Sequence, residues 1–201
     1  MSKSSAKLRI VASNDHNSAR ENLAKTFKNT MTDHLRAHTE GTNVNSSTLL
    51  TTDYLNHFNE IIMLLELVPS APSQFAAELA EWQHESYEEH FTHSGFRDKE
   101  LAIVCYRNAP EDIRRAFDSS VADLEQEMVL LLQDVQKKVS SGDTEGLTGL
   151  CNESVPRLQD LVQITAGIVN GAIPCGEETP SNDDDRKDMT ATQSDVDALF
   201  D

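Results

Sequence analysis

Histidine and carboxylate residues at helical spacing are the first candidates for chemistry in this chain. Glu81-Trp-Gln-His84 has the Glu-x-x-His spacing that di-iron helical bundles use to bind metal. A complete site of that kind needs a second such element and further carboxylates facing it. His57-Phe-Asn-Glu60 has the reverse order, and Glu89, His90 and His93 are neighbours in sequence only. The spacing therefore predicts no metal site.

Motifs for covalent catalysis and for phosphotransfer are incomplete. A phosphotransfer histidine is typically followed by a Lys-Gly pair, and neither His38-Thr-Glu-Gly41 nor His57-Phe-Asn-Glu60 contains that lysine. The glycines form no phosphate-binding loop, and neither a Gly-x-Ser-x-Gly motif nor a Cys–His signature is present. The cysteines lack Cys-x-x-Cys spacing and are expected to be reduced thiols: Cys105, Cys151 and Cys175.

A carboxylate and an amide lie three residues apart in the segment Leu158-Gln-Asp-Leu-Val-Gln-Ile164. On a helix, Asp160 and Gln163 are about 60° apart and face the same side. The residues by themselves leave two interpretations open. The pair is part of a site, or it belongs to an ordinary polar face opposite an apolar stripe.

An all-α helical bundle is expected to position these residues, because apolar residues recur at helical spacing and no strand-like alternation occurs. The longest such pattern has steps of three or four residues over about 40 Å of helix. Its members are Ile113, Phe117, Val121, Leu124, Met128, Leu131, Val135 and Val139. Ser140-Ser-Gly-Asp143 ends it. Pro156 places the start of the return helix near Val155, after a loose stretch over 147–153.

The two helices are expected to form a long antiparallel hairpin at about 111–171. A one-faced hairpin of this length leaves its apolar seam half covered. We therefore expect a homodimer in which a second copy completes a four-helix bundle.

Four segments are expected along the chain. Residues 1–16 are predicted to be a disordered lead-in, and 17–172 a helical domain. Residues 173–190 are predicted to be an acidic flexible linker. Residues 191–201 are predicted to be an amphipathic partner-binding peptide that forms a short docking helix.

The charge is uneven along the sequence. The chain carries a net charge of −17, of which residues 1–40 contribute +3, residues 41–176 contribute −13 and residues 177–201 contribute −7. An acidic surface repels nucleic acid and anionic membranes and favours basic partner patches.

No apolar run reaches the roughly 18 to 20 residues of a membrane span, and none resembles a secretory signal. A cytoplasmic location without membrane insertion is expected.

The C-terminal peptide has an apolar stripe that its neighbouring residues in the sequence cannot cover. Val196, Leu199 and Phe200 have i, i+3, i+4 spacing, acidic residues lie on the other side (Asp195, Asp197 and Asp201), and Thr192 or Ser194 is a suitable N-cap. An isolated helix of this length is marginal in water. The pattern therefore indicates a helix that binds in a partner's groove.

This peptide resembles the C-terminal peptide of the CheZ family of chemotaxis phosphatases. The shared pattern is Ala-Ser/Thr-Gln, two variable residues, Val-Asp, one variable residue and Leu-Leu/Phe-Asp, which here spans 191–201 and includes Gln193. A related peptide opens the flagellar switch protein FliM. The resemblance implies docking on a CheY-like response regulator through Gln193, Asp195, Val196, Asp197, Leu199 and Phe200.

The segment over 158–164 resembles, more loosely, the active-site helix of the same family. The resemblance implies that Gln163 orients a water molecule in line with the aspartyl phosphate of the receiver, and that Asp160 pairs with a receiver lysine. A neutral amide can orient this water without repelling the phosphoryl group. The chain departs from the family in the spacing of the two residues. The family has them at i, i+4, whereas Asp160 and Gln163 are at i, i+3. One residue less rotates one side chain about the helix axis by about 100° relative to the other.

The sequence thus predicts a two-component or chemotaxis signalling protein. It is expected to bind a CheY-like response regulator and to promote its dephosphorylation as an aspartyl-phosphate phosphatase. It is expected to need no cofactor of its own, with Mg²⁺ entering only through the receiver. Two alternatives stay open: a non-catalytic adaptor that uses the same peptide, and a structural helical protein.

Overall fold

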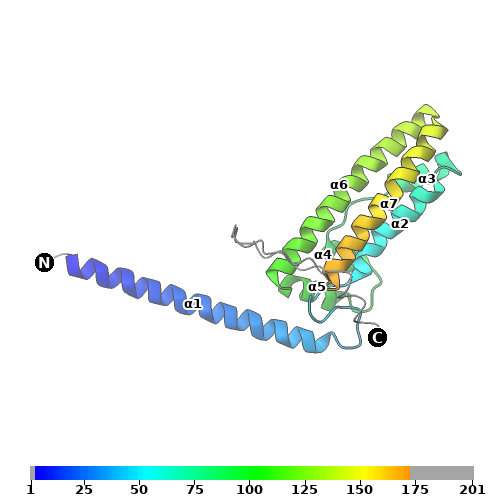
Figure 1. Ribbon diagram of the computed structural model, residues 1–201. Coiled ribbons are helices and arrows are strands. Elements are labelled where there is room, and N and C mark those ends of the chain that lie inside the picture. The colour runs from blue at the N-terminus through cyan, green and yellow to red at the C-terminus, as the bar shows by residue number, and fades with distance from the viewer. Residues whose placement is uncertain (1–2, 173–201) are drawn as a thin grey trace, which may run out of the picture.

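The computed structural model describes residues 3–172, with side chains described from residue 18 onward. Every regular element in this range is helical, which confirms the all-α prediction there. The elements are α1 (Lys3–His38), a 3-10 turn η1 (Thr52–Leu55), α2 (Asn56–Leu67), α3 (Pro72–Ala80), α4 (Tyr87–His93), α5 (Lys99–Asn108), α6 (Glu111–Ser141) and α7 (Thr144–Val169) (Figure 1). Among the described helices, none combines the length and apolar character needed to cross a bilayer.

The framework is the pair α6 and α7, which run side by side in opposite directions (Figure 1). Gly142 ends α6 in the left-handed region at φ 70°, where a residue without a side chain is favoured. The Asp143 carboxylate then accepts a hydrogen bond from the Gly146 amide (2.9 Å) and caps the start of α7. The turn is therefore sharp, and both helices keep their full length.

Helix α7 begins earlier than the sequence predicts. The prediction of a loose stretch over 147–153 and a helix start near Val155 is wrong, because α7 is continuous from Thr144 through Pro156. An interior proline costs a helix about 3 kcal/mol. The buried face runs unbroken past it through Leu147, Cys151 and Leu158, and Pro156 itself is exposed. Packing of that face offsets the lost backbone hydrogen bond.

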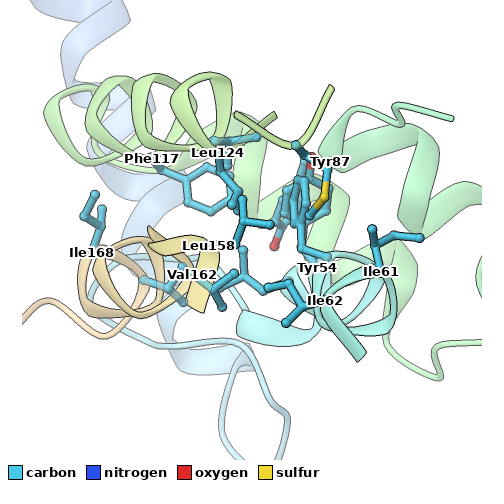
Figure 2. Close-up of a cluster of buried hydrophobic side chains, with 14 of the residues drawn as sticks. Tyr54, Ile61, Ile62, Tyr87, Phe117, Leu124, Leu158, Val162 and Ile168 are labelled. Atoms are coloured by element: carbon cyan, nitrogen blue, oxygen red, sulfur yellow. The ribbon is translucent and has the colours of Figure 1, made fainter. Parts of the chain in front are cut away.

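The apolar seam of α6 is buried within a single chain. Six of its eight members are buried, and the two at its ends, Ile113 and Val139, pack partly against the core. Helix α2 lies against α7 and α3 lies against α6. Figure 2 shows Phe117 and Leu124 of α6 facing Leu158 and Val162 of α7, with side chains from α2 closing the cluster. The seam of α6 is therefore buried within one chain, mainly against α7 and α3, and the homodimer stays a prediction.

Helix α1 also differs from the expectation for its first part. It begins at Lys3, inside the stretch 1–16 that the sequence predicts to be disordered. No glycine or proline occurs before Gly41, so no residue interrupts the helical backbone. Figure 1 shows α1 extending away from the other helices, with only its C-terminal part beside them. There Leu35 is buried, and the Thr32 hydroxyl donates to the Asn108 carbonyl oxygen (3.3 Å).

The loop between α1 and η1 is fastened to the end of α7. The Thr48 side chain is fully buried, and its hydroxyl donates a hydrogen bond to the Val169 carbonyl oxygen (2.6 Å). This carbonyl is one of the last in α7, where intrahelical donors are missing. The bond places the start of α2 beside the end of α7, so these two helices run antiparallel.

Candidate functional site

Asp160 and Gln163 lie on the outer face of α7. Both are exposed, whereas Leu158, Val162 and Thr165 bury the opposite face of the same helix. This arrangement follows from the 3.6-residue period, since the buried and exposed residues occupy different sides of the helix. The structure thus keeps the predicted pair on one solvent-accessible face, where a macromolecular partner can reach it.

Helix α2 borders this face. The Gln159 amide donates to the Glu66 carboxylate (3.1 Å), which joins α7 to α2 beside Asp160. Exposed apolar side chains lie on the same two helices, with Met63 exposed by 57% and Ile164 by 47%. The exposed surface of these two helices therefore carries carboxylate, amide and apolar groups.

The peptide residues predicted to bind a partner lie outside the described residues. These are Gln193, Asp195, Val196, Asp197, Leu199 and Phe200. The predicted linker over 173–190 lies outside them as well. Their roles stay predictions.

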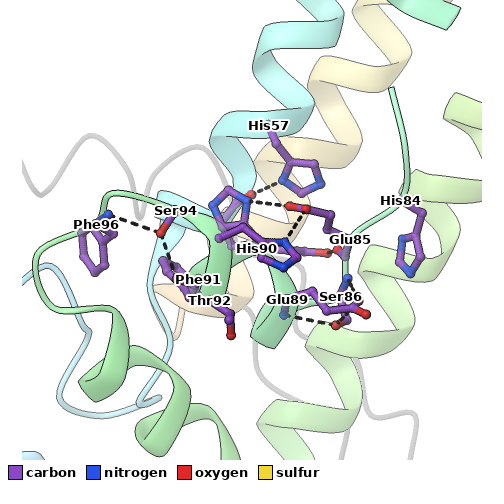
Figure 3. Close-up of polar contacts among 12 residues, drawn as sticks. His57, His84, Glu85, Ser86, Glu89, His90, Phe91, Thr92, Ser94 and Phe96 are labelled. Atoms are coloured by element: carbon purple, nitrogen blue, oxygen red, sulfur yellow. Dashed lines mark hydrogen bonds and ion pairs between the residues drawn. The ribbon is translucent and has the colours of Figure 1, made fainter. Parts of the chain in front are cut away.

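A second polar cluster lies where α4 meets α2, and Figure 3 shows its members. Glu85 precedes α4, and its carboxylate is 2.9 Å from His93 Nδ1 and 3.8 Å from His90 Nδ1. The His57 ring, from α2, is 5.1 Å from the His90 ring between centroids. Ser86 and Glu89 form a capping box that fixes the first turn of α4. The cluster therefore holds α4 against α2.

Burial favours the neutral form of His57, and a backbone hydrogen bond fixes which ring nitrogen carries the proton. Its Nδ1 lies 2.5 Å from the Tyr54 carbonyl oxygen, which can only accept, so Nδ1 carries the proton. Its Nε2 is buried with no hydrogen-bond partner among the described residues. Burial lowers the pKa of His57 from 6.5 to about 4, partly opposed by that backbone hydrogen bond. Burial also lowers the pKa of His90.

Glu125 of α6 forms the other unusual contact. Its carboxylate is 2.6 Å from His84 Nδ1, and burial raises its pKa while His84 opposes that shift. The two residues border a cavity of about 170 Å³ that Tyr54, Tyr106 and Asp118 also line. His84 thus contacts a carboxylate from α6 and not the Glu81 of its own Glu-x-x-His motif. Within residues 18–172, no three His, Cys, Asp or Glu side chains are arranged to hold a metal ion.

These contacts were not predicted from the sequence. Glu125 lies directly after Leu124 in the seam of α6, and its partner comes from a segment between α3 and α4 that has no helical pattern. Only the packing of α3 on α6 brings the two together. The described cysteines, Cys105 and Cys151, are both buried free thiols, and burial raises the pKa of Cys105 to about 11. Cys105 is therefore a poor nucleophile.

The stability of the protein should depend on pH through His57. Its pKa is about 4 in the fold and 6.5 in the unfolded chain, so folding disfavours its protonation. The stabilisation is complete above pH about 6.5 and is lost as the pH falls towards 4. Glu125 acts with the opposite sign, because its raised pKa favours the protonated folded form.

We expect the urea midpoint of unfolding to be lower at pH 5 than at pH 7.5, and His57→Gln to make this difference smaller. The control is the exposed His38→Gln, which should leave it unchanged. An equal fall in all three proteins would contradict this assignment.

Comparisons with known proteins add no relative: no family model, no curated protein and no solved structure matches the chain.

Proposed function

We propose that the protein binds a CheY-like response regulator through residues 191–201 and promotes the dephosphorylation of the bound regulator at α7. The observation that carries this proposal is the pattern of the peptide, whose apolar and acidic positions both resemble those of the CheZ family. The exposure of Asp160 and Gln163 supports the catalytic half, since a site that acts on another protein must be open to it.

The lengths involved are compatible with one receiver contacting both places. Asp160 is nine residues before the end of α7 at Val169, which is about 14 Å of helix at 1.5 Å per residue. A linker over 173–190 spans up to about 60 Å when fully extended. A receiver held by the peptide is therefore within reach of the outer face of α7. Short tethers that allow both contacts give an effective concentration in roughly the millimolar range.

The proposed chemistry is hydrolysis of an aspartyl phosphate. Gln163 orients a water molecule for in-line attack, and its neutral amide does not repel the phosphoryl group. Asp160 pairs with a lysine of the receiver, as the resemblance implies. Mg²⁺ belongs to the receiver and neutralises charge on the phosphoryl oxygens. In this proposal the phosphatase forms no covalent intermediate of its own.

The second candidate is an adaptor that binds the regulator without hydrolysing its phosphate. The i, i+3 spacing of Asp160 and Gln163 favours it, because the two groups are rotated by about 100° relative to the i, i+4 pair of the family. Both candidates share the peptide and differ only in the effect on phosphate lifetime.

Binding through the peptide should depend most strongly on Phe200. Phe200→Ala should weaken binding of the full chain to a phosphorylated receiver by about 2 to 4 kcal/mol, the range of a buried aromatic anchor. Titration with a labelled receiver measures this change. Met189→Ala is the matched control, because it removes an apolar side chain next to the peptide but outside the pattern. Equal binding by both variants, or no binding by the unchanged chain, would refute the proposal.

A further inference from the structure

The part of α1 that leaves the body of the protein presents large apolar side chains to solvent. Leu23 is exposed by 71% and Phe27 by 68%, the two highest values among the exposed large apolar residues of the described range. They are four residues apart and so share one face. We call residues 18–31 of α1 the arm. Met31, at the end of the arm, packs partly against the core, and Leu23 and Phe27 lie beyond this last contact.

The apolar face of the arm continues the stripe of Met31 and Leu35, which pack against the body, and extends past the body at Phe27 and Leu23. Lys25, Asn29 and Thr32 line the cleft between α1 and the start of α6. At about 100° per residue these positions lie nearly opposite Phe27 on the helix. A single helix with an uncovered apolar face is marginal in water. The arm therefore requires cover from elsewhere.

A suitable apolar groove lies between α3 and α6. Its volume is about 360 Å³, within the range of pockets that hold compact ligands. It is lined largely by apolar side chains, with Ala76, Leu79, Ala80, Trp82, Val129 and Leu132 among them.

The charges of the arm and the groove are complementary. Arg20 is three residues before Leu23 and seven before Phe27, so it lies on the apolar face of the arm. Exposed Glu81 lies between two groove-lining residues, and Glu125 contacts groove-lining His84. Residues 1–40 carry +3 and residues 41–176 carry −13, so two arms repel each other whereas an arm and a body attract.

The arm cannot reach the groove of its own chain as a continuous helix. It meets the body near Asn108 and Glu111, at the start of α6, whereas the groove lies at residues 129–136 of that helix. The separation along α6 is about 27 to 37 Å. α1 extends away from the body, and its sequence contains no glycine or proline at which to turn back (Figure 1).

We propose that the arm of one copy docks in the α3–α6 groove of a second copy, with Leu23 and Phe27 in the groove and Arg20 beside Glu81. The exchange is reciprocal, so a two-fold symmetric dimer forms two identical contacts. This dimer is independent of the proposed phosphatase activity and leaves the outer face of α7 uncovered.

Light scattering of the full chain tests the dimer. At tens of micromolar, the unchanged protein should have twice the chain mass of 22.3 kDa. Phe27→Asp should yield the monomer mass with unchanged helical circular dichroism, since Phe27 is exposed in the single chain. Ser18→Asp adds the same charge on the opposite face of the arm and should stay dimeric. A monomeric unchanged protein or a dimeric Phe27→Asp variant would overturn the proposal.

A charge exchange identifies the partner surface. Arg20→Glu and Glu81→Lys should each weaken the dimer by about tenfold or more. The chain that carries both changes, or a mixture of the two single variants, should recover it, because each arm then meets a groove of opposite charge. Lys25→Glu, on the face turned to the body, is the control and should leave the dimer intact. Arm–arm pairing or docking elsewhere predicts no recovery, and that result would overturn the groove as the site.

Discussion

Leu124→Ala should lower the free energy of unfolding by about 2 to 5 kcal/mol, the range for a buried leucine truncated to alanine. Leu124 is fully buried between α6 and α7, so a cavity remains where its side chain packed. Leu130→Ala on the same helix is the matched control. Leu130 is exposed by 52%, and its loss should change stability by less than about 1 kcal/mol. Urea unfolding followed by circular dichroism measures both.

The same experiment tests whether one chain covers the seam. If α7 and α3 of the same chain bury it, Phe27→Asp, which abolishes the proposed arm exchange, should unfold at a midpoint independent of protein concentration. A midpoint that rises with concentration in that variant would show that a second copy covers the seam, because association stabilises the folded state by mass action. Equal effects of Leu124→Ala and Leu130→Ala would contradict the packing of α6.

Gln163→Ala should lower the rate at which the protein dephosphorylates a bound receiver by about 100-fold, which is about 2.7 kcal/mol of barrier. The reason is the loss of the amide that we propose orders the attacking water. Receiver affinity should stay unchanged, because the proposed docking peptide is residues 191–201, on a different segment. Gln126→Ala, an exposed glutamine on α6, is the control and should keep the full rate. Loss of the receiver's phosphate signal over time measures the effect.

Two outcomes would revise this assignment in different ways. An unchanged protein that binds the phosphorylated receiver without shortening the phosphate lifetime would refute catalysis and leave the adaptor. Acceleration that survives Gln163→Ala would place the water-orienting group elsewhere. In both outcomes, the loss of receiver binding in Phe200→Ala would still support residues 191–201 as the receiver-binding segment.

Several features of this protein follow from its sequence because they are local. The apolar periodicity of 111–139 predicts α6, and Gly142 and Asp143 predict the turn, because helix spacing and capping depend on residues within a few positions. The exposure of Asp160 and Gln163 follows in the same way from their place opposite Leu158 and Val162. The partner-binding pattern of 191–201 rests on the sequence alone, since these residues lie outside the described range.

Other features depend on residues that are distant in sequence, and only the tertiary structure decided them. The sequence predicts a half-covered seam on the hairpin because nothing local shows that α3 also lies over α6. The continuity of α7 through Pro156 required the buried face that its neighbours provide, which offsets a local penalty. The low pKa of His57 depends on burial between α2 and α4, and the contact of Glu125 with His84 depends on packing across α3 and α6. The arm illustrates both levels, because its apolar spacing is local, whereas its lack of cover appears only when every other helix has been placed.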